Sequence, residues 1–386
     1  MLTKVRFKNF KSFVNEVVIN LEPTKSEILK DTNTYNDVLK GCCFYGSNAS
    51  GKTNALNAIT LLLDMLFKNI VNNVQLITIF NNELYMYFEY TFLIDNKEIV
   101  YYFEISREWK ILKETLTIDG INKMCRLVNS CESFITDKKD YGKDDVNENI
   151  LFLRTIYFNT GFSGYDELIH WFDFLKKSVY INFAKGKIVN PREENDNIKV
   201  YLENYLNKYG TDDINTFFNK FNFPYNIIYT KAQISENTMF STFSTRLRFI
   251  RQNMVDIPYF MESSGNIVLL NILSSILTTI KTGGMLIVDD FGYGLHNKLE
   301  ELLIEYVFKH SKNCQLFFAS HSTNLLKTSL LRPDQIYSVD FDEYGSFLKK
   351  FSDEKPRESQ NLEKMYLSGV FGGIPLYDKN QDNNDN

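Results

Sequence analysis

The segment Gly46-Ser47-Asn48-Ala49-Ser50-Gly51-Lys52-Thr53 decides the fold of this chain, because it fits the phosphate-binding pattern G-x-x-x-x-G-K-[ST]. An apolar run at 38–45 precedes this segment, and a run with helical periodicity follows it at 55–67. The glycines let backbone N–H groups curl around a phosphate, and the start of the helix adds its positive dipole end. We therefore expect a strand, a phosphate loop and a helix, in that order.

The polar side chains of this segment predict ATP and Mg²⁺ as cofactors. Lys52 would reach the β- and γ-phosphates, and the Thr53 hydroxyl would bind the magnesium ion. The alternative, a glycine-rich turn with a solvated lysine, is disfavoured by the strand before the loop and the helix after it. The expected nucleotide-binding residues are Gly46, Ser47, Asn48, Ala49, Ser50, Gly51, Lys52, Thr53 and Asn54.

A second apolar strand, MLIVDD at 285–290, ends in two carboxylates. Ligands bind at the carboxyl ends of strands in open α/β sheets. We expect Asp289 to hold Mg²⁺ through water, and Asp290 to orient or deprotonate the attacking water. Taken alone, such a strand end is more often a turn or a helix cap, but the phosphate loop favours the functional interpretation.

Two further segments are candidates for the same site. His321 follows the apolar run CQLFFA and is placed to hydrogen-bond a γ-phosphate, although it would also suit a helix cap. Ser263, Ser264 and Gly265 begin a predicted helix, where free N–H groups offer a second anion site or an ordinary cap. Two incomplete phosphate sites in one chain suggest that two subunits share the nucleotide.

The rest of the chain predicts an α/β fold with a central parallel sheet. The β-rich runs at 84–94, 98–106 and 111–118 predict an antiparallel meander beside the phosphate loop. We expect four regions: 1–120 as the first half of an ATPase head, 121–252 as a helical insertion, 253–377 as the second half, and 378–386 as a disordered tail.

Composition limits the other possibilities. Of the 386 residues, 44% are hydrophobic and 24% are charged, as in ordinary globular proteins, and the net charge of −5 argues against a general cation for nucleic acid. The five cysteines have no paired metal spacing and indicate no disulfide framework. We find neither a signal peptide nor an apolar run of membrane-spanning length, so we expect a cytoplasmic protein without membrane contact.

Together these motifs resemble the ABC-class ATPase heads of the SMC, RecF and OLD kind. Within that class the chain resembles the AAA-family branch found in bacterial abortive-infection and anti-phage operons, which includes AbiLi and AriA of the PARIS system. The resemblance begins at LTKVRFKNFKSF and continues through GSNASGKTN, ESSGN, LIVDDFGYGLH and FFASHSTNLL. It ends with LLRPDQIYSVDFDEYG and EKMYLSGVFGGIP, a tail typical of this branch.

The resemblance implies that two heads form a homodimer, or a higher homo-oligomer, around ATP. Ser263 and Gly265 would approach the γ-phosphate held by the other head, Asp290 would take the base position and His321 the switch position. Gly294-Leu295-His296 would lie at the seam. Relatives usually carry Glu in place of Asp290, so we expect slow hydrolysis. No Q-loop glutamine could be placed in this sequence, because none lies between Gln75 and Gln233.

The resemblance also implies a role. We expect a sensor or scaffold subunit of an anti-phage system that controls a separate effector, such as a Toprim- or RloB-like nuclease or toxin, with phage protein or DNA as trigger. One alternative is a RecF-like repair ATPase that binds DNA directly, for which Lys176, Lys177, Lys185 and Lys187 offer a weak basic patch. Another is a nucleotide-locked dimer with negligible turnover.

Overall fold

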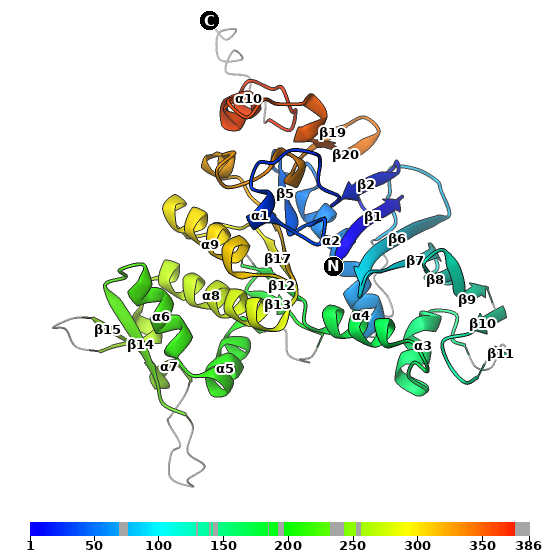
Figure 1. Ribbon diagram of the computed structural model, residues 1–386, viewed down its shortest axis with the longest axis horizontal. Helices are drawn as coiled ribbons and strands as arrows, with labels where there is room; N and C mark the ends of the chain where they lie inside the picture. The colour runs from blue at the N-terminus through cyan, green and yellow to red at the C-terminus, as the bar shows by residue number, and fades with distance from the viewer. Residues whose placement is uncertain are drawn as a thin grey trace, which may run out of the picture.

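The structure is a computed structural model. It describes residues 1–68, 76–128, 130–138, 140–141, 146–183, 185–191, 197–231, 243–251 and 256–374. Two large sheets dominate it, one antiparallel and one mostly parallel, and helices lie around both (Figure 1).

The antiparallel sheet has the strand order β11-β10-β9-β8-β7-β6-β1-β2. Its strands are β1 (Leu2–Lys8), β2 (Val17–Asn20), β6 (Tyr85–Ile94), β7 (Lys97–Ser106), β8 (Ile111–Ile118), β9 (Ile121–Leu127), β10 (Ser130–Ser133) and β11 (Asp140–Tyr141). Alternate residues of β7 and β8 are buried, as expected for strands with one face on a core. Asp95 and Asn96 both have positive φ and close the two-residue turn between β6 and β7. The predicted meander is confirmed.

The central sheet has the strand order β13-β12-β17-β18-β5-β19-β20. Its strands are β5 (Gly41–Tyr45), β12 (Val179–Asn182), β13 (Lys187–Val189), β17 (Gly284–Asp289), β18 (Cys314–Ala319), β19 (Ile336–Asp342) and β20 (Gly345–Lys350). The five inner strands run parallel, and only the edge strands β13 and β20 are antiparallel to their neighbours. Strands β5, β17 and β18 are buried at every residue, which explains their nearly continuous apolar sequences.

Helices cover both faces of the central sheet. Alternate residues of β17 divide between two cores: Met285 and Ile287 pack with α2 (Lys52–Phe67) and α4 (Asp166–Lys176). Leu286 and Val288 pack with α8 (Ser264–Thr282) and α9 (Asn297–His310). The period of two along the strand therefore builds a three-layer α/β sandwich. The predicted fold class is confirmed.

Smaller elements complete the described part of the chain. The remaining helices are α1 (Lys30–Asn33), α3 (Phe152–Asn159), α5 (Ile198–Tyr209), α6 (Asp212–Lys220), α7 (Phe243–Arg246) and α10 (Leu362–Leu367). The remaining strands are β3 (Thr34–Tyr35), β4 (Val38–Leu39), β14 (Tyr225–Tyr229), β15 (Leu247–Arg251) and β16 (Ile257–Pro258). Short 3₁₀ turns are η2 (Tyr259–Met261), η3 (Thr323–Leu325), η4 (Pro333–Gln335) and η5 (Phe351–Glu354).

One described helix, α8, has the length and composition of a membrane span, with 19 residues and a mean hydropathy of 1.2. It is more than half buried within the protein and contacts β17, α5, α6 and α9. Its apolar character is therefore explained by its position in the core.

The middle of the chain differs from the single helical insertion expected over 121–252. Strands β9 to β11 extend the antiparallel sheet, and β12 and β13 join the central sheet. Only α5, α6, β14, α7 and β15 form a separate lobe, which packs against α8 (Figure 1). Short strands such as β12 gain their stability from neighbours distant in sequence, so local periodicity did not reveal them. The expected tail, 378–386, lies outside the described residues.

Candidate functional site

The phosphate loop joins β5 to α2, and its backbone explains its glycines. Gly51 has φ of 115°, and a side chain there would lie 2.6 Å from Ser346 Oγ. A Cβ at Gly46 would lie 2.3 Å from the carbonyl oxygen of Val339. The loop therefore lies against β19 and β20, where only glycine fits. Ser346 also donates a 2.6 Å hydrogen bond to the Ser50 carbonyl, which fixes the loop on the sheet.

Lys52 is the first residue of α2, and its ammonium group turns back onto its own loop. Nζ donates to the carbonyl oxygens of Gly46, at 3.0 Å, and Ser47, at 2.8 Å. Burial lowers the pKa of Lys52 to about 8, although the carboxylates of Asp290 and Asp289 oppose this shift. The site thus contains a desolvated cation that a phosphate would stabilise.

Asp289 lies at the carboxyl end of β17, where two neutral side chains hold its carboxylate. The Thr53 hydroxyl donates to Oδ1 at 3.1 Å, and the Asn182 amide donates to Oδ2 at 2.9 Å. Burial and the neighbouring Asp290 raise the pKa of Asp289, and these two hydrogen bonds oppose the rise. The predicted loop residue and the predicted strand-end acid are therefore in direct contact.

Sequence reasoning missed Asn182. It ends β12, which lies parallel to β17 with Asn182 in register with Asp289, although the two are 107 residues apart. The available signal was the short run VYIN, in which a polar residue ends an apolar strand. The structure therefore adds this carboxamide to the residues in contact with Asp289.

Asp290 and His321 lie close to Lys52. Asp290 follows β17 with a φ of 55°, in the left-handed region, and His321 follows β18 and is exposed. Burial and the Lys52 ammonium lower the pKa of His321, whereas Asp290 raises it. Because β17, β18 and β5 are parallel neighbours, the residues that follow their carboxyl ends lie at one edge of the sheet.

Ser263, Ser264 and Gly265 lie elsewhere in the molecule. The Ser263 hydroxyl caps α8 by accepting a 3.3 Å hydrogen bond from the N–H of Asn266. A Cβ at Gly265 would lie 2.9 Å from the Gly294 carbonyl, so the start of α8 lies beside the predicted seam segment. Among the described residues, no hydrogen bond joins 263–265 to the loop at 46–54. Within one copy these residues form a helix cap.

The other predicted loop residues differ in accessibility. Asn48 and Ala49 are exposed at the rim, Ser47 is half-buried and Ser50 is buried. The Asn54 side chain donates a 2.8 Å hydrogen bond to Ser12 Oγ, so it connects α2 to the turn after β1. The nucleotide-binding roles of all these residues stay predictions.

The donor set fits magnesium bound together with a nucleotide. In the described part of the chain, no three His, Cys, Asp or Glu side chains gather into a metal cluster. Thr53 and Asp289 supply hard oxygen atoms, which suit Mg²⁺, but they leave most of its six coordination positions to water and phosphate. The raised pKa of Asp289 indicates a carboxylate that a cation would stabilise.

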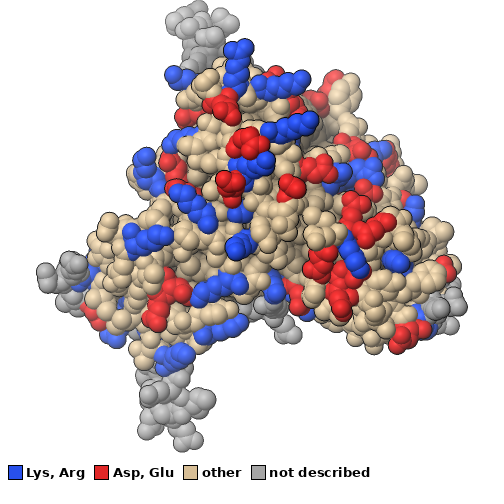
Figure 2. All heavy atoms as spheres, viewed as in Figure 1, with Lys and Arg blue, Asp and Glu red and all other residues tan. Residues whose placement is uncertain are grey.

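The basic patch considered for DNA does not form one surface. Lys176 pairs with Asp173 at 3.1 Å on α4, whereas Lys185 and Lys187 line a cavity beside α2. On the face shown in Figure 2, basic and acidic side chains are interspersed. These observations do not favour direct binding of duplex DNA.

Comparisons with known proteins support the fold. Residues 153–327 match a family model described as "AAA domain, putative AbiEii toxin, Type IV TA system", a range that includes Asp289 and His321 but not the phosphate loop. An SMC head bound to the C-winged helix domain of ScpA is 13% identical with a TM-score of 0.51, covering 90% of this chain and 96% of that chain. The SMC head domain from Thermotoga maritima is 14% identical with a TM-score of 0.48, covering 90% and 98%. The search of curated proteins found no match.

At this level of identity, the likeness with a TM-score above 0.5 shows the fold alone. The chain has the fold of an SMC-head-type P-loop ATPase.

Proposed function

We propose that this chain binds and hydrolyses ATP. The observation that carries the proposal is the hydrogen bond between Thr53 and Asp289, since it joins the phosphate loop to the strand-end acid at one corner. Lys52 would exchange the carbonyls of Gly46 and Ser47 for the β- and γ-phosphates of the nucleotide.

Each polar group around this corner has a task in the proposed hydrolysis. Asn182 orients Asp289, and Thr53 and Asp289 would hold the magnesium ion, directly or through water, that neutralises charge on the phosphates. Asp290 accepts the proton of the attacking water, and neutral His321 donates a hydrogen bond to the γ-phosphate. The water oxygen forms a bond to Pγ as the Pγ–O bond to the β-phosphate breaks, and the electron pair of the broken bond leaves with ADP.

The base position favours slow turnover. Asp290 is one methylene shorter than the glutamate usual in similar heads, so the water lies further from ideal geometry. Slow turnover would let the nucleotide act as a timer.

We further propose that two copies complete the site. In one copy Ser263 and Ser264 are exposed and make no described hydrogen bond with the phosphate loop. A second copy, arranged head to head, would present the partner's Ser263 and the partner's Gly265 to the γ-phosphate. Each helix start then adds N–H donors to an anion that the phosphate loop already binds.

In the cell we propose a cytoplasmic sensor or scaffold in an anti-phage system of the abortive-infection kind, like AbiLi and AriA. The description of the matching family, a putative AbiEii toxin of a type IV toxin–antitoxin system, supports a role in such systems. We assign toxicity or nuclease activity to a separate effector, and the trigger to a phage protein or DNA. We propose that residues 1–120, 121–252 and 253–377 are three regions of that head.

Two experiments test these proposals. Phosphate release by the wild type and by Asp290→Ala separates an ATPase from a nucleotide-locked dimer, because equal rates near zero would support the lock. Expression of the chain alone, and together with the product of its neighbouring gene, tests whether toxicity belongs to a separate effector. Growth arrest by the chain alone would contradict a separate effector, whereas an ATP-dependent complex on gel filtration would support it.

A further inference from the structure

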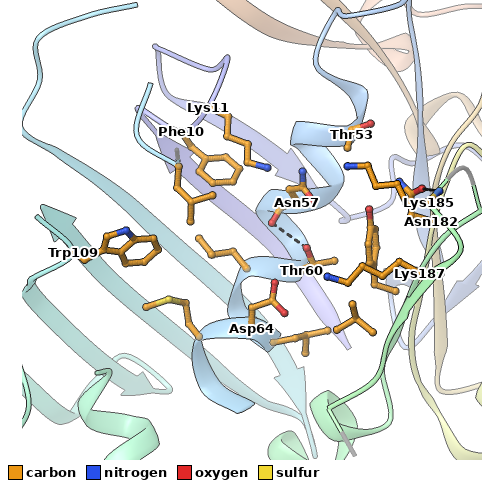
Figure 3. A pocket seen from close by; sticks show the side chains of 16 residues that line it. Phe10, Lys11, Thr53, Asn57, Thr60, Asp64, Trp109, Asn182, Lys185 and Lys187 are labelled. Carbon is orange, nitrogen blue, oxygen red and sulfur yellow. Dashed lines mark hydrogen bonds between the residues drawn. The ribbon is translucent and has the colours of Figure 1, made fainter. Parts of the chain in front are cut away.

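A cavity of about 300 Å³ continues from the Thr53–Asp289 corner along one side of α2 (Figure 3). Thr53 and Asn182, which both hold Asp289, line one end of it. Phe10, Leu61, Trp109 and Tyr180 contribute apolar walls. The cavity is therefore continuous with the place where the γ-phosphate would be cleaved.

Two lysines face each other across this cavity. Figure 3 shows Lys11, from the turn after β1, and Lys185, from the connection between β12 and β13, pointing toward one another with Asn57 of α2 between them. Among the residues that the structure describes, no carboxylate lies within ion-pair distance of either ammonium group. Burial and the Lys185 ammonium both lower the pKa of Lys11, and the carboxylates of Asp64 and Asp289 oppose this shift.

Lys11 is half-buried and Lys185 is exposed, so their like charges repel each other across the cavity, although solvent weakens the repulsion. An anion between them would remove this repulsion and would gain two charge-assisted hydrogen bonds. The side-chain amide of Asn57 offers a neutral N–H donor at the same place.

The far end of the cavity has a different character. Thr60, Asp64 and Lys187 lie there, further along α2 than Asn57 (Figure 3). The Asp64 carboxylate disfavours an anion at that end, and the Asp289 carboxylate disfavours one directly beside Thr53, so the favourable position lies between the two lysines. The cavity volume suits a small oxyanion better than a second nucleotide.

We propose that Lys11, Lys185 and Asn57 form an oxyanion subsite that receives the inorganic phosphate freed at the phosphate loop. The subsite rests on the proposed ATPase function and adds a regulatory step to it. Phosphate held there leaves slowly, and the head stays in its product state while the subsite is filled.

Product inhibition tests the subsite. Initial rates of ATP hydrolysis by the full chain are measured with increasing inorganic phosphate, with chloride at matched ionic strength as the reference. Phosphate inhibits the wild type, and raising ATP does not relieve the inhibition, because the subsite lies outside the phosphate loop. Lys11→Gln and Lys185→Gln each raise the inhibition constant about tenfold, and the surface variant Lys30→Gln leaves it unchanged.

Wild-type hydrolysis that phosphate does not inhibit overturns the subsite, as does equal inhibition of the wild type and both cavity variants. If the wild type hydrolyses no ATP, the proposed function fails. In that case, the nucleotide-free chain is titrated with inorganic phosphate in a calorimeter. Phosphate binding that is lost in Lys11→Gln and Lys185→Gln but kept in Lys52→Ala supports the subsite. Any other pattern of binding overturns it. Displacement of phosphate by a short oligonucleotide would assign the cavity to a nucleic-acid backbone and overturn the proposal.

Discussion

Lys52 illustrates how a single side chain prepares a site for its ligand. Lys52 as a residue is 7% exposed, and its ammonium group contacts the carbonyls of Gly46 and Ser47 in place of water. Folding of the protein has therefore already removed water from the Lys52 ammonium group before any phosphate binds. A phosphate that replaces these carbonyls gains a strong interaction with little further cost.

We expect Lys52→Ala to weaken ATP binding about 100-fold or more, because two charge-assisted hydrogen bonds of roughly 1.5 kcal/mol each are lost. Titration with a fluorescent ATP analogue measures the change. Lys30→Ala removes an exposed lysine paired only with Glu27 and serves as the control. Unchanged affinity in Lys52→Ala would exclude the phosphate loop as the binding site.

Asn182 acts through Asp289. Its amide fixes one carboxylate oxygen while Thr53 fixes the other, so both oxygens have defined directions before any ion binds. Residues that orient a metal-binding carboxylate in this way affect metal affinity strongly.

Asn182→Ala should lower Mg²⁺-dependent hydrolysis about 10- to 100-fold and raise the Mg²⁺ concentration needed for half-maximal rate. Rates measured over a magnesium titration show both effects, and Asn159→Ala, at an exposed position of α3, is the control. A lower rate with an unchanged magnesium requirement would argue against the orienting role.

At the scale of elements, a buried ion pair fixes the loop between β2 and α1 to the turn before β19. Arg332 donates to both carboxylate oxygens of Asp334, at 2.9 and 2.8 Å, and both residues are almost fully buried. Asp334 also accepts hydrogen bonds from the N–H and hydroxyl of Thr24. The pair therefore connects two loops about 310 residues apart.

Asp334→Asn should lower the free energy of unfolding by about 3–5 kcal/mol at pH 7, because it leaves a buried guanidinium without its counter-charge. Burial alone would raise the pKa of Asp334, but Arg332 and Thr24 lower it below its ordinary value. This contribution is complete above pH ~4 and is lost as the pH falls further. In urea unfolding between pH 3 and 7, the free energy of unfolding of the wild type should approach that of the variant as the pH falls. The exposed Asp353→Asn is the control, and a pH-independent difference would contradict the account.

At the scale of the whole molecule, no hydrogen bond among the described residues joins the start of α8 to the phosphate loop within one copy. The phosphate loop lies against β19 and β20, and the start of α8 lies beside Gly294. Exposed Ser263 and Ser264 are then available to a second copy. The proposed dimer follows from this separation.

We expect Asp290→Ala to accumulate a dimer with ATP, since cleavage is blocked while binding is kept. Adding Ser263→Glu should return it to a monomer, because a carboxylate would face the γ-phosphate held by the other copy. Gel filtration with light scattering measures the mass, and Ser368→Glu, at an exposed position, is the control. A dimer that forms without ATP and that persists in the Ser263→Glu variant would contradict the shared site.

The sequence alone determined strands β5, β17 and β18 of the central sheet and the residues that follow them. Phosphate loops and buried strands depend mainly on residues that are near in sequence. The pattern at 46–53 and the continuous apolar strands before Asp289 and Ser320 could therefore be recognised without the tertiary structure. Only the tertiary structure decided that Asn182 contacts Asp289, that β9 to β11 belong to the antiparallel sheet, and that Lys11 faces Lys185. These pairings depend on which elements bury one another, and the free energy of that burial is shared among residues distant in sequence.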